Sequence, residues 1–268
     1  MNIEEFIART PFAKKAEPLA YMDCGIIAIN KGSGIMSHPN PKRERNESPS
    51  IVRAKYNFSG EYYSWEDTAS GEKMRLHLIN RLDSPTSGVM LASADGRVAE
   101  AARAAFREKS AKKVYYAVCG GRSFVKSGDW SDLIEIRKTG AFVRGRAAES
   151  GGYKSRSHFE VERTDQNGMG LSLVRLEPLT GRTHQLRIQC AKHGLPILGD
   201  ATYGDFQLNR RFRSVFSIPR MFLHCFSTSV EFEIGGEKIS FSAEAPLPES
   251  FEKALSFDGR ATAKLRGI

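Results

Sequence analysis

Three short segments of the sequence gather residue types that can carry out chemistry. The first is residues 80–89, NRLDSPTSGV, where Asp83 stands among small and turn-forming residues directly before an apolar run. A carboxylate exposed at such a turn could act as a nucleophile or a general base. An Asp in a loop can equally well cap the turn through its own side chain, so the residues alone leave both interpretations open.

The second segment is residues 180–189, TGRTHQLRIQ, which places four polar side chains where a strand is expected to give way to a helix: Arg182, His184, Gln185 and Arg187. The free backbone N–H groups and guanidinium forks of such a junction suit a phosphate or a carboxylate. The alternative is an ordinary helix start whose arginines are solvated.

The third segment is residues 113–118, KVYYAV, which has the composition of a strand. In a strand Tyr115 and Tyr116 point to opposite faces, so one can pack in a core while the other lines a cleft. A tyrosine in a cleft offers a flat face for a base and a hydroxyl for proton transfer. Two ordinary half-buried tyrosines are the alternative.

The elements that must position these segments are read from periodicity and turn residues. Apolar runs predict strands at 26–30, 89–93 and 114–118, and Asp95 predicts the start of a helix over 96–109. Further predictions are strands at 158–163 and 171–177, a helix over 185–193, and a hairpin of strands 230–234 and 238–242 around two glycines. Strands outnumber helices without a regular alternation, which favours an α+β fold with a mixed, mainly antiparallel sheet.

Other stretches give weaker signals. Residues 39–72 are polar and predict an irregular excursion with one short helix around 50–56, and residues 121–152 predict only turns and short extended pieces. The first 20 residues predict a loosely attached arm.

Composition narrows the class of protein. Lys and Arg number 40 against 31 Asp and Glu, a net charge of +9, which favours a polyanionic partner such as nucleic acid. The excess is uneven, since residues 73–116 hold nine bases and four acids. A hydrophobic content of 40% argues against a disordered chain, and no apolar run is long enough for a membrane span. The four cysteines form no CxxC pair and the six histidines no HExxH motif, so we predict no metal site.

Taken together, the motifs resemble those of the RluA-type pseudouridine synthases. The matching segments occur in the family's order over roughly residues 24–248: NKGSGIMSHP at 30–39, RLDSPTSGVML at 81–91, KVYYAV at 113–118, LTGRTHQLRIQCAKHGLPILGDATYG at 179–204 and RMFLHC at 220–225. The joint presence of the second and fourth segments is highly specific.

The resemblance implies a pseudouridine synthase catalytic-domain fold with a central RNA-binding cleft. It also implies an enzyme that isomerises specific uridines of structured RNA, ribosomal or transfer, by base flipping and a catalytic aspartate, without a cofactor. Asp83 matches that aspartate, Tyr115 the tyrosine that stacks on the target base, and Arg187 the basic residue that pairs with the aspartate. How the aspartate acts, at C1′, at C6 or through a glycal, stays open.

The substrate contacts expected around these three residues are Arg81, Leu223, Arg182, His184 and Gln185, with Lys112 and Lys113 on the RNA backbone. One departure from the family pattern is Asn80, where a histidine usually precedes the RLD motif, and His77 lies three residues upstream.

The expected organisation is an N-terminal arm over 1–20, the catalytic domain over 21–250 and a C-terminal tail over 251–268, without an S4-type RNA-binding module. We expect a cytoplasmic monomer with RNA as its partner and no membrane association. Two other functions are weighed against the enzyme. A non-catalytic RNA-binding protein would have the same charge pattern, and a glycosidase would need a second carboxylate beside the bond, for which the sequence offers no convincing candidate.

Overall fold

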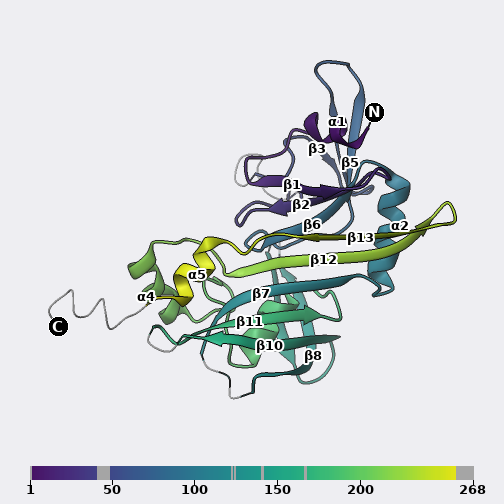
Figure 1. Cartoon of the computed structure of the whole chain (residues 1–268). Coiled ribbons are helices and arrows are strands. Elements are labelled where there is room, and N and C mark those ends of the chain that lie inside the picture. The colour runs from purple at the N-terminus through teal and green to yellow at the C-terminus, as the bar shows by residue number, and fades with distance from the viewer. Residues whose placement is uncertain are drawn as a thin grey trace. The chain divides into compact units, whose positions relative to one another are not determined.

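The computed structural model describes residues 2–40, 49–121, 123, 125–139, 142–165 and 168–257. The chain divides into two compact units (Figure 1). Unit 1 consists of Met1–Lys113 and Cys225–Ala245, and unit 2 of Val114–His224 and Pro246–Ile268. Each unit is built around a mainly antiparallel arrangement of strands, which confirms the predicted α+β class.

The sheet of unit 1 is centred on β6, whose residues are buried along the whole strand. β6 pairs with three strands, namely β2, β5 and β12. On the far side of β2 lies β1, and on the far side of β5 lie β4 and then β3. β13 pairs with β12 in a long hairpin (Figure 1). The strands are β1 (Ala16–Tyr21), β2 (Ile26–Lys31), β3 (Lys55–Asn57), β4 (Tyr62–Glu66), β5 (Lys73–Leu78), β6 (Ser87–Ser93), β12 (Leu223–Ile234, in unit 1 from Cys225) and β13 (Glu237–Glu244).

Two helices complete unit 1, and the N-terminal one corrects an expectation. α1 (Ile3–Ala8) buries Ile3 and Phe6, and β1 hydrogen-bonds to β2, so the described residues of the expected arm, 2–20, are packed into the unit instead of being loosely attached. α2 (Gly96–Arg107) begins at Asp95, whose side chain accepts a hydrogen bond from the Arg97 amide, as the sequence predicts.

The stretch 39–72 also differs from its prediction. No helix forms around 50–56 in the described part of this stretch; β3 and β4 form there instead, and residues 41–48 lie outside the described residues. The aromatic side chains explain the strands, because Tyr63 is fully buried and packs 4.9 Å, centroid to centroid, from Tyr56.

The sheet of unit 2 has the order β7-β11-β10-β8-β9. Its strands are β7 (Lys112–Gly120, in unit 2 from Val114), β8 (Ser127–Thr139), β9 (Phe142–Ala148), β10 (Tyr153–Thr164) and β11 (Leu171–Pro178). The hairpin of β8 and β9 corrects the expectation of turns and short pieces over 121–152.

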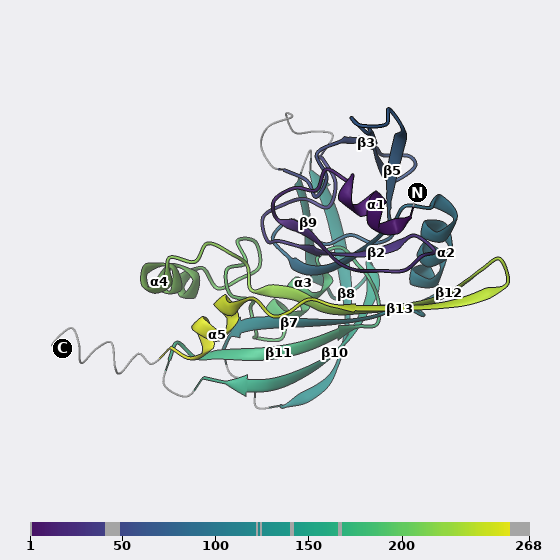
Figure 2. The same ribbon diagram turned by 45° about the horizontal axis from the view of Figure 1, so that its top comes forward.

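Three helices belong to unit 2: α3 (Gln185–Lys192), α4 (Phe206–Phe216) and α5 (Glu249–Leu255). α3 lies against β8 and β9 (Figure 2). α4 and α5 pack on a core that includes Phe212, Phe222 and Phe251. The expected tail therefore begins inside the core, since Phe251 is fully buried, while residues 258–268 lie outside the described residues. None of the described helices is long and apolar enough to cross a membrane.

Candidate catalytic site

The turn that carries Asp83 is clamped by the segment that follows β2. The hydroxyl of Ser37 donates to the carbonyl of Leu82 at 2.8 Å and accepts from the Leu82 amide at 3.0 Å. The Gly34 amide donates to the carbonyl of Ser84, and the Asp83 carbonyl accepts from the Thr86 amide. The backbone on both sides of Asp83 is thus held in one conformation, and the half-buried carboxylate stands on a rigid base.

Lys31, the last residue of β2, ties the same two segments together from inside. Its side chain is fully buried, and its ammonium donates to the carbonyls of Gly32, Ile35 and Ser84 at 3.1, 2.8 and 3.0 Å. A buried cation is tolerated only where polar groups replace its water. The motifs at 30–39 and 81–91, separate in the sequence, therefore form one structure.

The departure at Asn80 has a structural explanation. The side-chain oxygen of Asn80 accepts a hydrogen bond from the Leu91 amide at 2.7 Å, so Asn80 fixes the chain against β6. His77 lies in β5 with its ring 5.1 Å from that of Tyr62, and burial lowers its pKa. His77 therefore serves the packing of β4 on β5, and Asn80 supports the turn through the backbone.

Arg81 lies at the surface beside the Asp83 turn. Its side chain is 57% exposed, and its guanidinium lies 3.4 Å from both a carboxylate oxygen of Glu61 and Nε2 of His38. Both contacts are long and solvent-exposed, so each adds little to holding the Arg81 side chain in place.

The two lysines expected on the RNA backbone differ in their surroundings. Lys112 is exposed. Lys113 is half-buried with its ammonium 5.7 Å from the ring centroid of Phe106, and burial lowers its pKa. Lys112 therefore faces solvent, whereas Lys113 packs against α2.

In unit 2 the side chain of Arg187 forms a buried two-point ion pair that the sequence reading missed. Its Nε and a terminal nitrogen donate to the two carboxylate oxygens of Asp200 at 2.7 and 2.9 Å, and its guanidinium lies 5.0 Å from the ring centroid of Tyr203. Burial alone would raise the pKa of Asp200, but the bonds from Arg187 and from the Thr202 and Tyr203 amides hold it below its usual value. The sequence does contain a signal for this ion pair, because Asp200 directly follows the apolar run LPILG.

His184 stands at the start of α3 in a left-handed conformation, with φ of 56°. Its Nδ1 lies 2.9 Å from the hydroxyl of Tyr203, and that hydroxyl also accepts a hydrogen bond from the Gly145 amide of β9. His184, Arg187, Asp200 and Tyr203 thus form one polar cluster at the N-terminal end of α3.

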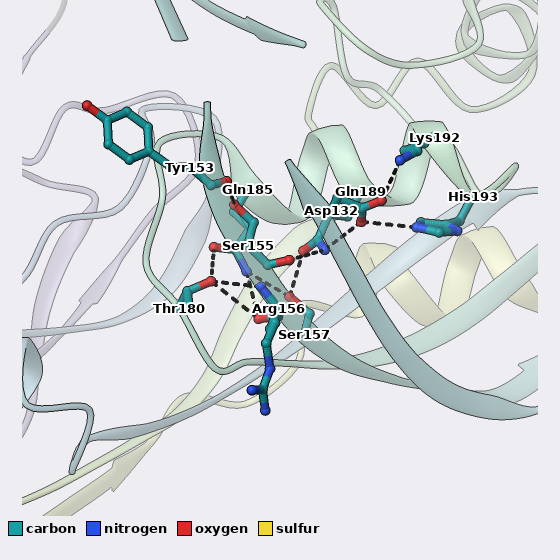
Figure 3. A network of polar contacts seen from close by, with 10 residues as sticks. All are labelled: Asp132, Tyr153, Ser155, Arg156, Ser157, Thr180, Gln185, Gln189, Lys192 and His193. Carbon is teal, nitrogen blue, oxygen red and sulfur yellow. Dashed lines mark hydrogen bonds and ion pairs between the residues drawn. The ribbon is translucent and has the colours of Figure 1, made fainter. Parts of the chain in front are cut away.

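Gln185 corrects its predicted role in substrate binding (Figure 3). Its side chain is 4% exposed, and its oxygen accepts from the Thr180 hydroxyl at 2.7 Å and the Arg182 amide at 3.1 Å. Its nitrogen donates to the Arg156 carbonyl and the Ser157 hydroxyl, both at 2.9 Å. Because every hydrogen-bonding position of the amide is in use, Gln185 shapes the 180–184 loop and has none left for a substrate.

The network continues along α3 (Figure 3). Gln189 accepts from the Ser157 hydroxyl and donates to Asp132 of β8, which also accepts from Lys192 at 2.7 Å and lies 3.1 Å from His193. Burial works to raise the pKa of Asp132, yet these bonds outweigh it and lower the pKa. The network fixes α3, and with it Arg187, on the sheet of unit 2.

The tyrosine pair in β7 separates as the strand pattern predicts. Tyr115 is 9% exposed, whereas Tyr116 is half-buried and donates to Glu162 at 3.0 Å. Leu223, at the start of β12, is 3% exposed. Arg182 is exposed, with its guanidinium 5.1 Å from the ring centroid of Tyr153.

Comparisons with known proteins identify the family of the chain. The sequence profile of the RNA pseudouridylate synthase family matches residues 25–192. A tRNA pseudouridine synthase C of Yersinia pestis is 29% identical over 242 residues, covering 86% of this chain and 87% of that protein. An uncharacterized RNA pseudouridine synthase of Bacillus subtilis is 30% identical, covering 86% of this chain and 68% of that protein.

Two further proteins extend the comparison. The ribosomal large subunit pseudouridine synthase C of Escherichia coli K12 is 29% identical over 91% of this chain and 70% of its own length. The structure of human RNA pseudouridylate synthase domain containing 1 superposes with a TM-score of 0.64 at 22% identity, covering 93% and 94% of the two chains, which shows the same fold. The chain therefore belongs to the RluA-type RNA pseudouridine synthases.

Proposed function

We propose that this protein converts specific uridines of structured ribosomal or transfer RNA to pseudouridine, with Asp83 as the catalytic carboxylate. The observation that carries the proposal is the Asp83 turn, whose backbone is held by Ser37 and by the buried ammonium of Lys31. A catalytic group must keep its geometry to within a fraction of an ångström, and such a clamp provides it.

The proposed reaction is an isomerisation. The target uridine flips out of the RNA, the carboxylate assists cleavage of the bond between N1 and C1′, and the uracil rotates without leaving. A new bond joins C5 to C1′, and the proton on C5 is removed while N1 gains one. No electrons are gained or lost, so the proposal includes no redox cofactor.

The other residues of the matching motifs take the remaining roles. In our proposal Tyr115 stacks on the flipped base, Leu223 contributes an apolar wall, and Arg187 keeps the catalytic carboxylate ionised. Arg81, Arg182, His184 and Lys112 contact the RNA around the target.

The names of the relatives support two classes of RNA substrate. One is named for transfer RNA and another for large-subunit ribosomal RNA, so we propose one or both classes for this chain. We further propose that it works as a cytoplasmic monomer.

The catalytic role of Asp83 is tested by its replacement with Asn, which keeps the size of the side chain and removes the charge. We expect the D83N variant to bind RNA normally and to form pseudouridine about 10²–10⁴-fold more slowly, or not at all. Pseudouridines are mapped by chemical probing in RNA from a deletion strain that carries each variant.

Asp23→Asn serves as the matched control, because Asp23 is an exposed carboxylate in the same unit. Restoration of the modification by Asp83→Asn would show that Asp83 is not catalytic. Release of free uracil by the purified protein would point to a glycosidase, and RNA binding without turnover on any cellular RNA to a non-catalytic binding protein.

A further inference from the structure

A run of arginines on α4 stands apart from the site described above. Arg210, Arg211 and Arg213 are all exposed, and none of their guanidinium groups makes a hydrogen bond, ion pair or ring contact with another described residue. Three cations in four positions repel one another unless an anion lies between them.

The three arginines share the outer half of the helix. Phe212 is 3% exposed and stacks 4.5 Å from Phe216, which fixes the inner face. At 100° per residue, Arg210 lies nearly opposite Phe212, and Arg211 and Arg213 lie about 100° to either side of Phe212, all within about one turn of the helix. They therefore present an array of guanidinium groups to solvent.

Three other exposed arginines already have acidic partners. Arg97 pairs with Asp95 at 2.7 Å, Arg107 with Glu100 at 2.8 Å and Arg163 with Glu252 at 2.8 Å. Two of these lie in the basic stretch 73–116, so that stretch offers less free positive charge than its composition suggests. The free positive charge of α4 is concentrated on one short surface.

α4 is hydrogen-bonded to the loop that carries Asp200, the ion-pair partner of Arg187. Asn209, inside the helix, accepts a hydrogen bond from the Gly199 amide at 2.7 Å and donates to the Asp200 carbonyl at 3.0 Å. Asp200 is the partner of Arg187. The arginine array therefore has a fixed place relative to the residue proposed to act in catalysis.

We propose that the Arg210–Arg213 face of α4 binds the phosphate backbone of the RNA substrate next to the segment that is modified. The proposal rests on the proposed function, because it takes RNA to be the substrate. Guanidinium groups suit phosphate through two-point hydrogen bonds. The exposed apolar residues of the helix, Phe206 and Val215, lie near its two ends, so the basic face has no apolar stripe with which to enter a lipid bilayer.

The test is the triple variant Arg210→Gln/Arg211→Gln/Arg213→Gln, measured with a fluorescently labelled RNA stem-loop over a range of salt concentrations. We expect binding at ~0.1 M salt to weaken about tenfold or more. The slope of log K against log salt should become shallower by about two to three, because three phosphate contacts are lost. With RNA that is a substrate, KM should rise while kcat stays the same.

The matched control is Arg97→Gln/Arg107→Gln/Arg163→Gln, which removes the same charge from exposed arginines that already have acidic partners. It should leave the salt slope nearly unchanged. Thermal unfolding should be the same for the α4 variant and the parent, since the substitutions remove no hydrogen bond, ion pair or ring contact to a described residue.

Equal losses of RNA binding in the two variants would overturn the proposal, because charge alone would then explain the effect. Loss of binding to phosphatidylserine vesicles, with RNA binding intact, would overturn it in favour of a membrane surface. The stem-loop measurement detects RNA binding and needs no turnover. If the purified protein modified no RNA, the proposed function would be refuted, but RNA binding by the α4 arginines could still be measured.

Discussion

At the scale of single residues, the Arg187–Asp200 ion pair shows how unit 2 stabilises a buried charge. Both side chains are buried, and the carboxylate also accepts hydrogen bonds from the amides of Thr202 and Tyr203. A buried ion pair adds little net stability when intact, but loss of one partner leaves an uncompensated charge. Asp200 therefore fixes the direction in which the Arg187 guanidinium points.

Asp200→Asn should destabilise the protein by about 3–5 kcal/mol, because it strands the Arg187 guanidinium. The pKa of Asp200 is lowered by folding, so its contribution is complete above its unfolded pKa of about 4 and is lost as the pH falls through the folded value. Urea unfolding at a series of pH values should show a constant difference from the parent above about pH 5 that shrinks in acid.

The exposed Asp129 provides the comparison for Asp200. Its carboxylate is 77% exposed and contacts only His158 among the described ion pairs. Asp129→Asn should change stability by less than about 1 kcal/mol at any of these pH values. Equal effects of the two substitutions would contradict the role given to Asp200.

Residue types were easier to predict than residue surroundings. The sequence singled out Arg187 and Gln185 as bond-rich side chains, and both lie in the polar region around α3. It could not predict that Gln185 is saturated by backbone and hydroxyl groups from β10 and the 180–184 loop, because those partners are set by the fold. Lys113 shows the same limit, since only the packing of α2 decides that it covers Phe106.

At the scale of elements, Gly88 determines how closely β6 can approach β12. Its φ is +109°, and a Cβ atom there would lie 2.1 Å from the carbonyl oxygen of Cys225. Only glycine satisfies both conditions without moving the backbone. The glycine of the RLDSPTSG motif is thus explained by strand packing.

Gly88→Ala should destabilise the protein by about 3–5 kcal/mol, since strain at positive φ adds to a clash with backbone. Gly34→Ala is the matched control: Gly34 has φ of +90°, but a Cβ there would meet nothing within 4 Å. It should cost only about 1–2 kcal/mol. Denaturant unfolding of the two variants separates the clash from the strain, and similar losses would rule out the close approach as the cause.

Elements with strong local signals were predicted, and those made by distant packing were missed. The cap at Asp95 and the Gly235-Gly236 turn gave α2 and the β12–β13 hairpin directly. β9 was missed because its pattern, FVRGRAA, has no clean alternation and depends on its pairing with β8. α4 was missed although Asp205 caps it, because its apolar positions become meaningful only against Phe222.

At the scale of the whole molecule, the described surface offers little apolar area for self-association. The exposed large apolar residues come from separate loops and element ends: Tyr21, Met22, Phe58, Val125, Tyr153, Leu179, Phe206 and Val215. Isolated residues of this kind are normal on a monomer's surface.

We therefore expect a monomer, and light scattering after size-exclusion chromatography should give the mass of one chain over a hundredfold range of concentration. RNA should be removed beforehand by nuclease treatment, because a basic protein of net charge +9 can be linked by contaminating RNA. A concentration-dependent rise in mass after that treatment would contradict the expectation.

The interleaved path of the chain has a consequence for its synthesis. Unit 1 opens with Met1–Lys113 but receives β12 and β13 only from Cys225–Ala245. On the ribosome, the first segment must wait on the order of ten seconds for these strands. During that time β6 lacks its partner β12, and an unpaired apolar strand invites aggregation. A fragment that ends at Lys113 never receives β12, so we expect it to aggregate. For the same reason we expect nascent chains of this enzyme to bind chaperones that cover exposed strand edges.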